Sequence, residues 1–276
     1  MFFLSAFADE ISTDPAQQMD VLTQCGVRHI ELRSIHGTNV LLLSDAQVLA
    51  FKADLQQRGF RLSAIGSPIG KIRIDEPFAP HLEKFQRAIH LCRVFETPNI
   101  RIFSFYPPAE FSGDWAPHRA EVFHRLGQLV EIARKEGVTL FHENEHRIYG
   151  DSPERILDLH RQFDGPNFKA AFDPANFVYC GYDPMAGWLA SQRYTAHLHI
   201  KDWKKGADHG SLAGEGDGRI SEIINDVVKR GYSGFATLEP HLLGGGPTGG
   251  HTGPELFPKA VAAFKSILDK AGATYA

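Results

Sequence analysis

Cysteine is scarce in this sequence, and its spacing excludes one common way of stabilising a fold. The chain has three cysteines among 276 residues, at Cys25, Cys92 and Cys180. Their number is odd and no two form a CxxC pair, so a disulfide framework is not expected. Free cysteines suit a reducing compartment, and we therefore predict a cytoplasmic location.

Positive charge is not in excess either. The chain carries 29 Lys and Arg against 33 Asp and Glu, a net charge of -4. Proteins that bind nucleic acid non-specifically need a positive surplus to neutralise phosphates, so no nucleic-acid partner is expected. No apolar run reaches the roughly 18 residues of a membrane span, so no membrane partner is expected. The apolar start, MFFLSAFADE, lacks a basic flank and predicts a first strand instead of a signal peptide.

Short runs rich in β-forming residues alternate along the chain with longer amphipathic runs of helical period. Such alternation predicts parallel strands joined by crossover helices. The expected strands are 2–7, 28–32, 60–66, 99–105, 138–143, 168–173, 195–201 and 234–239. Eight units predict a single (β/α)8 TIM barrel over residues 1–276, because this fold uses about 250 residues. A doubly wound open sheet is the alternative, but it often has a glycine-rich turn after its first strand, where this chain reads ADEISTD.

Signals for helix starts and stops support this count. The expected helices are 14–25, 45–58, 79–95, 116–136, 151–163, 183–191, 219–230 and 254–271. Three of them begin with an Asp or Ser followed by Pro, which is typical of a helix N-terminus. Four glycines stand where a helix should end, at Gly26, Gly59, Gly137 and Gly231. The glycine-rich segment 240–253 is expected to form a loop over the barrel mouth.

Four consecutive expected strands end on or contain a potential metal ligand. These ligands are Glu143, Asp173, His199 and Glu239. The C-terminal ends of barrel strands meet at one mouth, so the four side chains are expected to converge there. Singly, a carboxylate at a strand end is more often a cap or surface group, and a strand histidine is more often a core residue. Together, three carboxylates and an imidazole suit one divalent ion, Mn²⁺ first, with Mg²⁺, Co²⁺, Fe²⁺ or Zn²⁺ as alternatives.

Four segments carry a resemblance to a known family. They are GVTLFHENE, FDPANF, AHLHIKD followed by GEGDG, and GFATLEPH. In this order they resemble the sugar phosphate isomerase/epimerase group of the xylose isomerase-like TIM barrel superfamily, which also includes endonuclease IV-type nucleases. The resemblance implies that Glu143, Asp173, His199 and Glu239 hold the metal. It also implies that Glu143 and Glu239 act as acid and base.

The resemblance implies a metal-dependent sugar isomerase or epimerase that transfers a proton through an enediolate. The expected partner is a small sugar or polyol, phosphorylated or not. The oligomeric state stays open, with a homo-oligomer among the alternatives. A dehydratase acting on an inosose-like or 3-dehydroshikimate-like ketone is the alternative. A non-catalytic sugar-binding barrel and an abasic-site endonuclease are weaker alternatives. The endonuclease would need histidines where this chain has Ser67, Ser104 and Asn176.

Several further residues near the strand ends are candidates for other roles. His142 is expected to face away from the site, because side chains alternate along a strand, and His197 to pack behind His199. Glu31 is either a substrate contact or the partner of an arginine, Arg33 or Arg101. Lys201 is expected either to contact substrate or to neutralise ligand charge. The candidate substrate contacts are Glu31, Glu145, His146, Asn176, Lys201 and Arg219.

Overall fold

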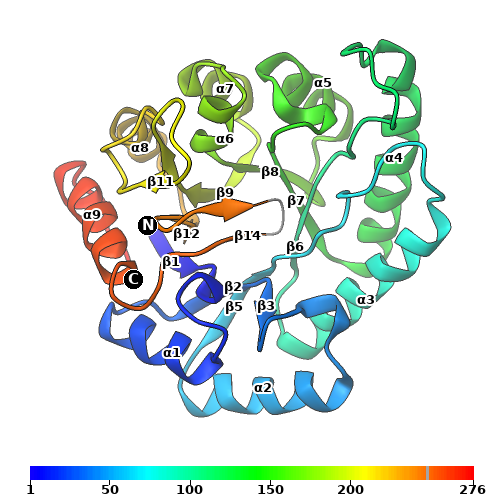
Figure 1. Ribbon diagram of the computed structural model, residues 1–276. Coiled ribbons are helices and arrows are strands. Elements are labelled where there is room, and N and C mark those ends of the chain that lie inside the picture. The colour runs from blue at the N-terminus through cyan, green and yellow to red at the C-terminus, as the bar shows by residue number, and fades with distance from the viewer. Residues whose placement is uncertain (247–248) are drawn as a thin grey trace.

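The computed structural model describes residues 1–246 and 249–276 and confirms the predicted barrel. Eight parallel strands close in the order β1-β12-β9-β8-β7-β6-β5-β2, and Figure 1 looks into the barrel. These strands are β1 (Phe2–Ala6), β2 (His29–Leu32), β5 (Arg61–Ile65), β6 (Asn99–Ile102), β7 (Thr139–Glu143), β8 (Phe168–Phe172), β9 (Thr195–Ile200) and β12 (Gly234–Leu238). Every one lies inside the range predicted from the sequence.

Helices surround the strands on the outside of the barrel (Figure 1). They are α1 (Pro15–Gln24), α2 (Asp45–Gln57), α3 (Ala79–Phe95), α4 (Arg119–Glu136), α5 (Pro153–Phe163), α6 (Pro174–Tyr179), α7 (Pro184–Ser191), α8 (Ile220–Lys229) and α9 (Phe257–Lys270). The side chains of Asp14, Ser152 and Asp183 cap α1, α5 and α7 as predicted. Only α6 has no counterpart among the expected helices. No helix of the described ranges is both long enough and apolar enough to cross a membrane.

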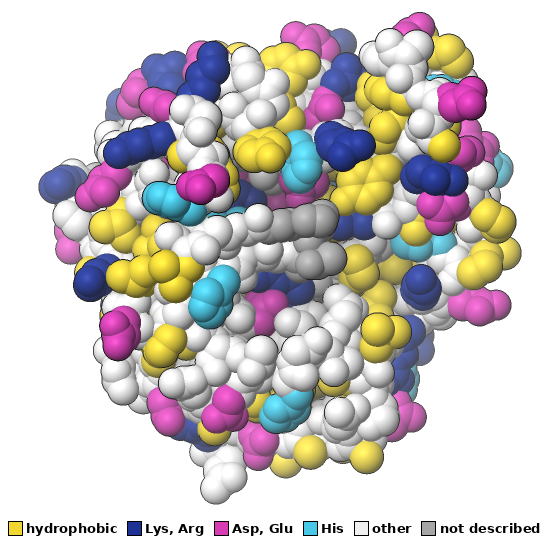
Figure 2. Space-filling model, in the orientation of Figure 1, with side chains coloured by type: hydrophobic (Ala, Val, Ile, Leu, Met, Phe, Trp, Pro, Cys, Tyr) yellow, Lys and Arg dark blue, Asp and Glu magenta, His cyan; other side chains and the backbone are white. Residues whose placement is uncertain are grey.

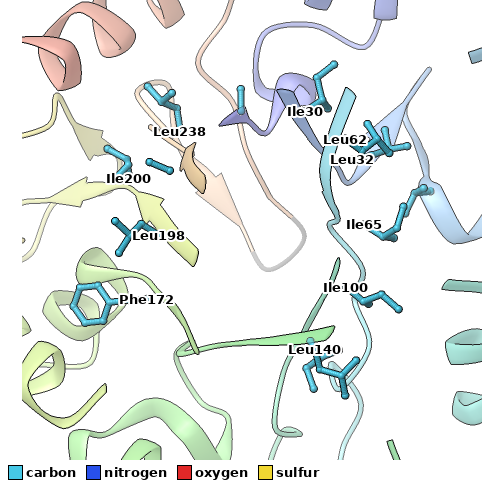
Figure 3. Close-up of a cluster of buried hydrophobic side chains, with 14 of the residues drawn as sticks. Ile30, Leu32, Leu62, Ile65, Ile100, Leu140, Phe172, Leu198, Ile200 and Leu238 are labelled. Atoms are coloured by element: carbon cyan, nitrogen blue, oxygen red, sulfur yellow. The ribbon is translucent and has the colours of Figure 1, made fainter. Parts of the chain in front are cut away.

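The main hydrophobic core lies between the strands and the helices. Apolar side chains on the outer face of the barrel form a ring in Figure 3 and are almost completely buried: Ile30, Leu32, Leu62, Ile65, Ile100, Leu140, Phe172, Leu198, Ile200 and Leu238. Burying one such side chain stabilises the fold by about 1.5–3 kcal/mol. The interior of the barrel is different, because it contains hydroxyls and charged groups. Within it the hydroxyls of Ser5 and Ser63 share a hydrogen bond of 2.7 Å.

The segment after β12 crosses the barrel mouth, as the sequence predicts. Its described part forms a two-stranded hairpin of β13 (Gly245–Gly246) and β14 (Gly249–Gly250), which Figure 1 shows above the barrel. Two of the predicted loop residues, 247 and 248, lie outside the described residues. A Cβ atom at Gly250 would come within 1.9 Å of the His241 ring, so this contact requires glycine. The hairpin therefore packs directly on side chains of the mouth.

The loop after β5 also approaches the barrel closely. Gly70 has a φ of +91°, and a Cβ atom there would lie 2.0 Å from the carbonyl oxygen of Phe103. Its N–H donates a hydrogen bond of 2.7 Å to Nε2 of His81 on α3. Burial lowers the pKa of His81 from 6.5 to about 4. The folded protein therefore holds His81 neutral, as an acceptor.

This contact predicts a loss of stability in mild acid. His81 has the lower pKa when folded, so its contribution is complete above pH 6.5 and is lost as the pH falls toward about 4. Between pH 7 and pH 5 the free energy of unfolding should fall by about 2 kcal/mol from this residue. Urea unfolding of the wild type and of His81→Gln at both pH values measures it. The variant, whose amide cannot be protonated, should show the smaller fall; equal falls would contradict the assignment.

Candidate metal centre

The four predicted ligands meet at the C-terminal mouth of the barrel. Glu143 ends β7, Asp173 follows β8, His199 lies in β9 and Glu239 follows β12. One ligand atom from each residue can be chosen so that all four lie within 4.8 Å of one another. All four side chains are buried, with at most 3% of any residue exposed. The parallel register explains the convergence, because β8 and β9 lie between β7 and β12 in the closed sheet.

Three cations neutralise the three carboxylates. The closest ion-pair distances are 3.2 Å from Arg101 to Glu143, 2.8 Å from Arg33 to Glu239 and 2.7 Å from Lys201 to Asp173. Nζ of Lys201 also lies 3.4 Å from Oε2 of Glu239. Burial disfavours the charge on Lys201, but Asp173 and Glu239 outweigh it and raise the pKa well above its usual value. Of the two roles expected for Lys201, charge neutralisation is the one these contacts display.

The donor atoms of this group fit a divalent cation. Burial raises the pKa of Asp173 to about 7 even though Lys201 acts in the opposite direction. Nδ1 of His199 has no hydrogen-bond partner among the described residues, yet it lies 3.2 Å from Oε1 of Glu143 and 3.8 Å from Oε2 of Glu239. A buried imidazole nitrogen facing carboxylate oxygens is an arrangement that a cation would stabilise.

Glu31 supports this group from below instead of lining the cavity. Its Oε2 atom lies 2.8 Å from Nε2 of His197 and 3.2 Å from Nε2 of His199. Glu31 was expected to contact a substrate or to pair with an arginine; in the structure it pairs with these two imidazoles and is not among the residues that line the cavity described below. His197 packs behind His199 as expected and also bonds Thr237 at 2.9 Å. A carboxylate on the far nitrogen of a ligand histidine orients its ring.

Phe7, which follows β1, connects the two sides of the group. The guanidinium of Arg33 lies 4.4 Å from the centre of the Phe7 ring, and that of Arg101 lies 4.8 Å from it. The rings of His199 and Phe7 also pack edge to face, with centroids 5.2 Å apart. Both arginines that hold the glutamates are therefore held by one aromatic ring. The sequence does not predict the role of Phe7. An inward position of Arg33 could have been predicted, because Arg33 stands two residues after Glu31 and side chains alternate along a strand.

His241 and Glu10 form an outer layer around Glu239. Nε2 of His241 lies 3.2 Å from Oε1 of Glu239 and 3.2 Å from Oε1 of Glu10. Glu10 in turn accepts hydrogen bonds from the backbone N–H of His241 and from the hydroxyl of Thr252. These contacts and the ion pair with Arg33 fix Oε1 of Glu239. Its Oε2 atom faces Lys201 and His199.

The four candidate ligands Glu143, Asp173, His199 and Glu239 are called the metal group below. A cavity of about 240 Å³ adjoins this group beneath the hairpin. Figure 2 shows acidic and basic side chains within the depressions beside the hairpin. Predicted substrate contacts that line the cavity are Glu145, His146, Asn176 and Lys201, and lining residues not predicted include Lys71 and His241. The amide of Asn176 also donates to Glu143 at 3.3 Å, so it links the cavity wall to the ligand group.

Arg219 is the other predicted substrate contact that the structure places away from the cavity. It precedes α8, is partly exposed, and pairs with Asp183 at 3.1 Å and with Glu222. The GEGDG loop, residues 214–218, directly precedes Arg219. Asp202 ties this loop to the barrel. Its carboxylate accepts N–H bonds of 2.8, 3.0 and 2.8 Å from Gly214, Gly216 and Gly218. This motif therefore shapes the rim and directs Arg219 outward.

His142 faces away from the metal group, as strand alternation predicts. Its ring stacks on Phe168 with centroids 5.9 Å apart and lies 6.0 Å from the ring of His160. Burial lowers its pKa to about 3, so it is a neutral core residue.

A family model describes almost all of this architecture. The model for the xylose isomerase-like TIM barrel matches residues 19–272, so the chain belongs to that family. The sequence is also 26% identical over 141 residues to the uncharacterized protein MJ1311 of Methanocaldococcus jannaschii. That match covers 45% of this chain and only 46% of the relative.

Solved structures of this fold match over nearly the full chain at low identity. A D-tagatose 3-epimerase-like protein has a TM-score of 0.78 at 17% identity, with 99% of this chain and 98% of the other covered. The probable 3-DHS dehydratase AsbF of Bacillus anthracis has a TM-score of 0.74 at 19% identity, with 96% and 99% covered. A Mycobacterium smegmatis barrel in complex with magnesium has a TM-score of 0.74 at 17% identity, with 99% and 97% covered. These likenesses establish the shared fold.

The position of Phe7 yields a prediction about metal affinity. Phe7→Leu keeps an apolar side chain but removes the ring on which both arginines lie, so the glutamates should lose their fixed orientation. We expect Mn²⁺ affinity to fall about tenfold, as for other residues that orient ligands from behind. Calorimetric titration of metal-free protein measures this. Phe51→Leu, in the core between α2 and α3, is the control and should leave affinity unchanged; an equal effect in both variants would contradict the role.

Proposed function

We propose that this protein is a divalent-metal-dependent isomerase or epimerase of a small ketose or related polyol ketone. The observation that carries the proposal is the buried convergence of Glu143, Asp173, His199 and Glu239 beside a cavity lined by charged, polar and aromatic side chains. These residues would hold the ion. A bound divalent cation would polarise a substrate carbonyl and acidify the neighbouring C–H bond.

The chain itself offers two carboxylates for proton transfer. Glu143 and Glu239 stand at the two ends of the ligand group, with the strands of Asp173 and His199 between them. One carboxylate would remove a proton next to the carbonyl group, and the other would return a proton to the same carbon or to its neighbour. The first outcome is epimerisation and the second is isomerisation. Lys201 offers an N–H donor to a substrate oxygen, because its ammonium carries three hydrogens and Asp173 and Glu239 take two, and Asn176 lines the same cavity.

A dehydratase is the second candidate, because the same proton abstraction can expel a hydroxyl group from the next carbon. The likeness to the probable 3-DHS dehydratase of Bacillus anthracis supports it at the level of fold. The endonuclease alternative loses support. Ser67 donates to the carbonyl of Arg101 and Ser104 accepts from Gly150, so both serve the backbone. Asn176 bonds Asn144 and Glu143, so it also stands within the protein's own hydrogen-bond network.

Metal content and proton exchange test the proposal together. Purified protein should contain about one divalent ion, and it should exchange the C–H next to the carbonyl of a ketose in D₂O. Glu143→Gln and Glu239→Gln should each lower exchange by about a hundredfold or more, since each removes an acid–base group. The panel pairs ketopentoses and ketohexoses with inosose and 3-dehydroshikimate; exchange or ultraviolet-absorbing products only with the latter two would favour the dehydratase.

Glu131→Gln is the matched control, since Glu131 is exposed on α4 and pairs with Arg134. It should keep full exchange. Full activity in metal-free protein would overturn the proposal, as would unchanged exchange in both glutamine variants of the ligand group.

A further inference from the structure

The charges around the cavity indicate the class of substrate it accepts. Four Lys and Arg side chains line it: Arg33, Lys71, Arg101 and Lys201. Each already contacts a carboxylate. Besides the pairs of the ligand group, Nε of Arg33 lies 2.8 Å from Asp9 and Nζ of Lys71 lies 3.1 Å from Oε2 of Glu145.

Counting the charges shows no surplus for an anionic ligand. Seven carboxylates contact these cations or His199, the one histidine of the ligand group: Asp9, Glu10, Glu31, Glu143, Glu145, Asp173 and Glu239. The four Lys and Arg side chains and a bound divalent ion together supply six positive charges. A protonated His241 would only bring the two signs into balance. A phosphate group would therefore enter a site whose described charges are already compensated.

Glu145 makes one wall of the cavity unfavourable for phosphate in particular. Its side chain is 11% exposed, and its two oxygens contact Lys71 and Nδ1 of His146, the latter at 2.7 Å. A phosphate ester carries roughly 1.5 to 2 negative charges near neutral pH. Bringing it beside this carboxylate would cost energy, because the wall is shielded from water. The exposed Lys204 and Lys205, the obvious alternative phosphate ligands, do not line the cavity.

The same wall suits hydroxyl groups. A hydroxyl both donates and accepts, and this wall offers carboxylate oxygens beside N–H donors. Tyr179 and Trp203 line the cavity next to it, with ring centroids 5.8 Å apart, and provide an apolar face for C–H groups. We propose that the substrate is an uncharged, unphosphorylated polyol ketone, and that Glu145 excludes the phosphate esters. This inference rests on the proposed function of the ligand group.

The test compares free ketoses with their esters. Exchange in D₂O is measured for D-fructose, D-ribulose and their terminal phosphate esters, with wild type, Glu145→Gln and Asp208→Asn. The wild type should favour the free ketose in kcat/KM by at least about a hundredfold. Glu145→Gln should shift this ratio toward the ester by about tenfold or more, since it removes the opposing charge. Asp208→Asn removes the same charge from a side chain that is 99% exposed and should not shift it.

The outcomes separate this inference from the proposed function. Exchange confined to the phosphate esters overturns the inference and keeps the function. An unchanged ratio in Glu145→Gln, or an equal shift in Asp208→Asn, overturns the role of Glu145. Exchange with no compound of either panel overturns the function. If no exchange is seen, or if Glu145→Gln does not fold, thermal unfolding of the wild type with D-fructose or with its phosphate ester tests the inference by binding. Greater stabilisation by D-fructose supports the inference, and equal or greater stabilisation by the ester overturns it.

Discussion

The compensation of buried negative charge is the constraint on which this structure depends. Three carboxylates lie within a few ångströms of one another at the mouth, and each would be costly to bury alone. Arg33, Arg101 and Lys201 form ion pairs with these carboxylates inside the barrel. Buried cations must in turn be supported. Asp9 holds Arg33 through an ion pair, and the Phe7 ring holds both arginines through cation–π contacts.

Because the barrel interior is charged, most of the apolar burial that stabilises the fold lies between the strands and the helices. The apolar side chains that face the helices form the continuous core, whereas the small apolar cluster of Ala64, Phe141 and Ala171 fills only part of the barrel interior. The interior is consequently free to vary in polarity as long as its charges are paired. The same barrel recurs in solved structures that are less than a fifth identical to this chain.

The sequence predicts the barrel and the convergence of the four ligands, because parallel strands must end at one mouth whatever their exact register. It does not predict how deep a side chain lies. Glu31 illustrates this, since its carboxylate pairs with His197 and His199 and does not line the cavity. Arg219 illustrates a second limit, because its direction is set by the loop that Asp202 binds. The support from Phe7 depends on ring and guanidinium positions that spacing alone does not reveal.

Specificity must come from residues outside the ligand group. Proton abstraction next to a carbonyl is common to epimerisation, isomerisation and dehydration, so the same four ligands are compatible with all three. The three reactions differ in the atom that receives the returning proton and in whether a hydroxyl group leaves. In this chain the cavity beside the four candidate ligands is lined by Lys71, Glu145 and His146, from the loops after β5 and β7, and by Gly245 and Gly249. Among the described residues of the hairpin, Gly245 and Gly249 line the cavity and present no side chain to it, so we expect its walls to set specificity, with Glu145 as the residue that we propose excludes phosphate esters.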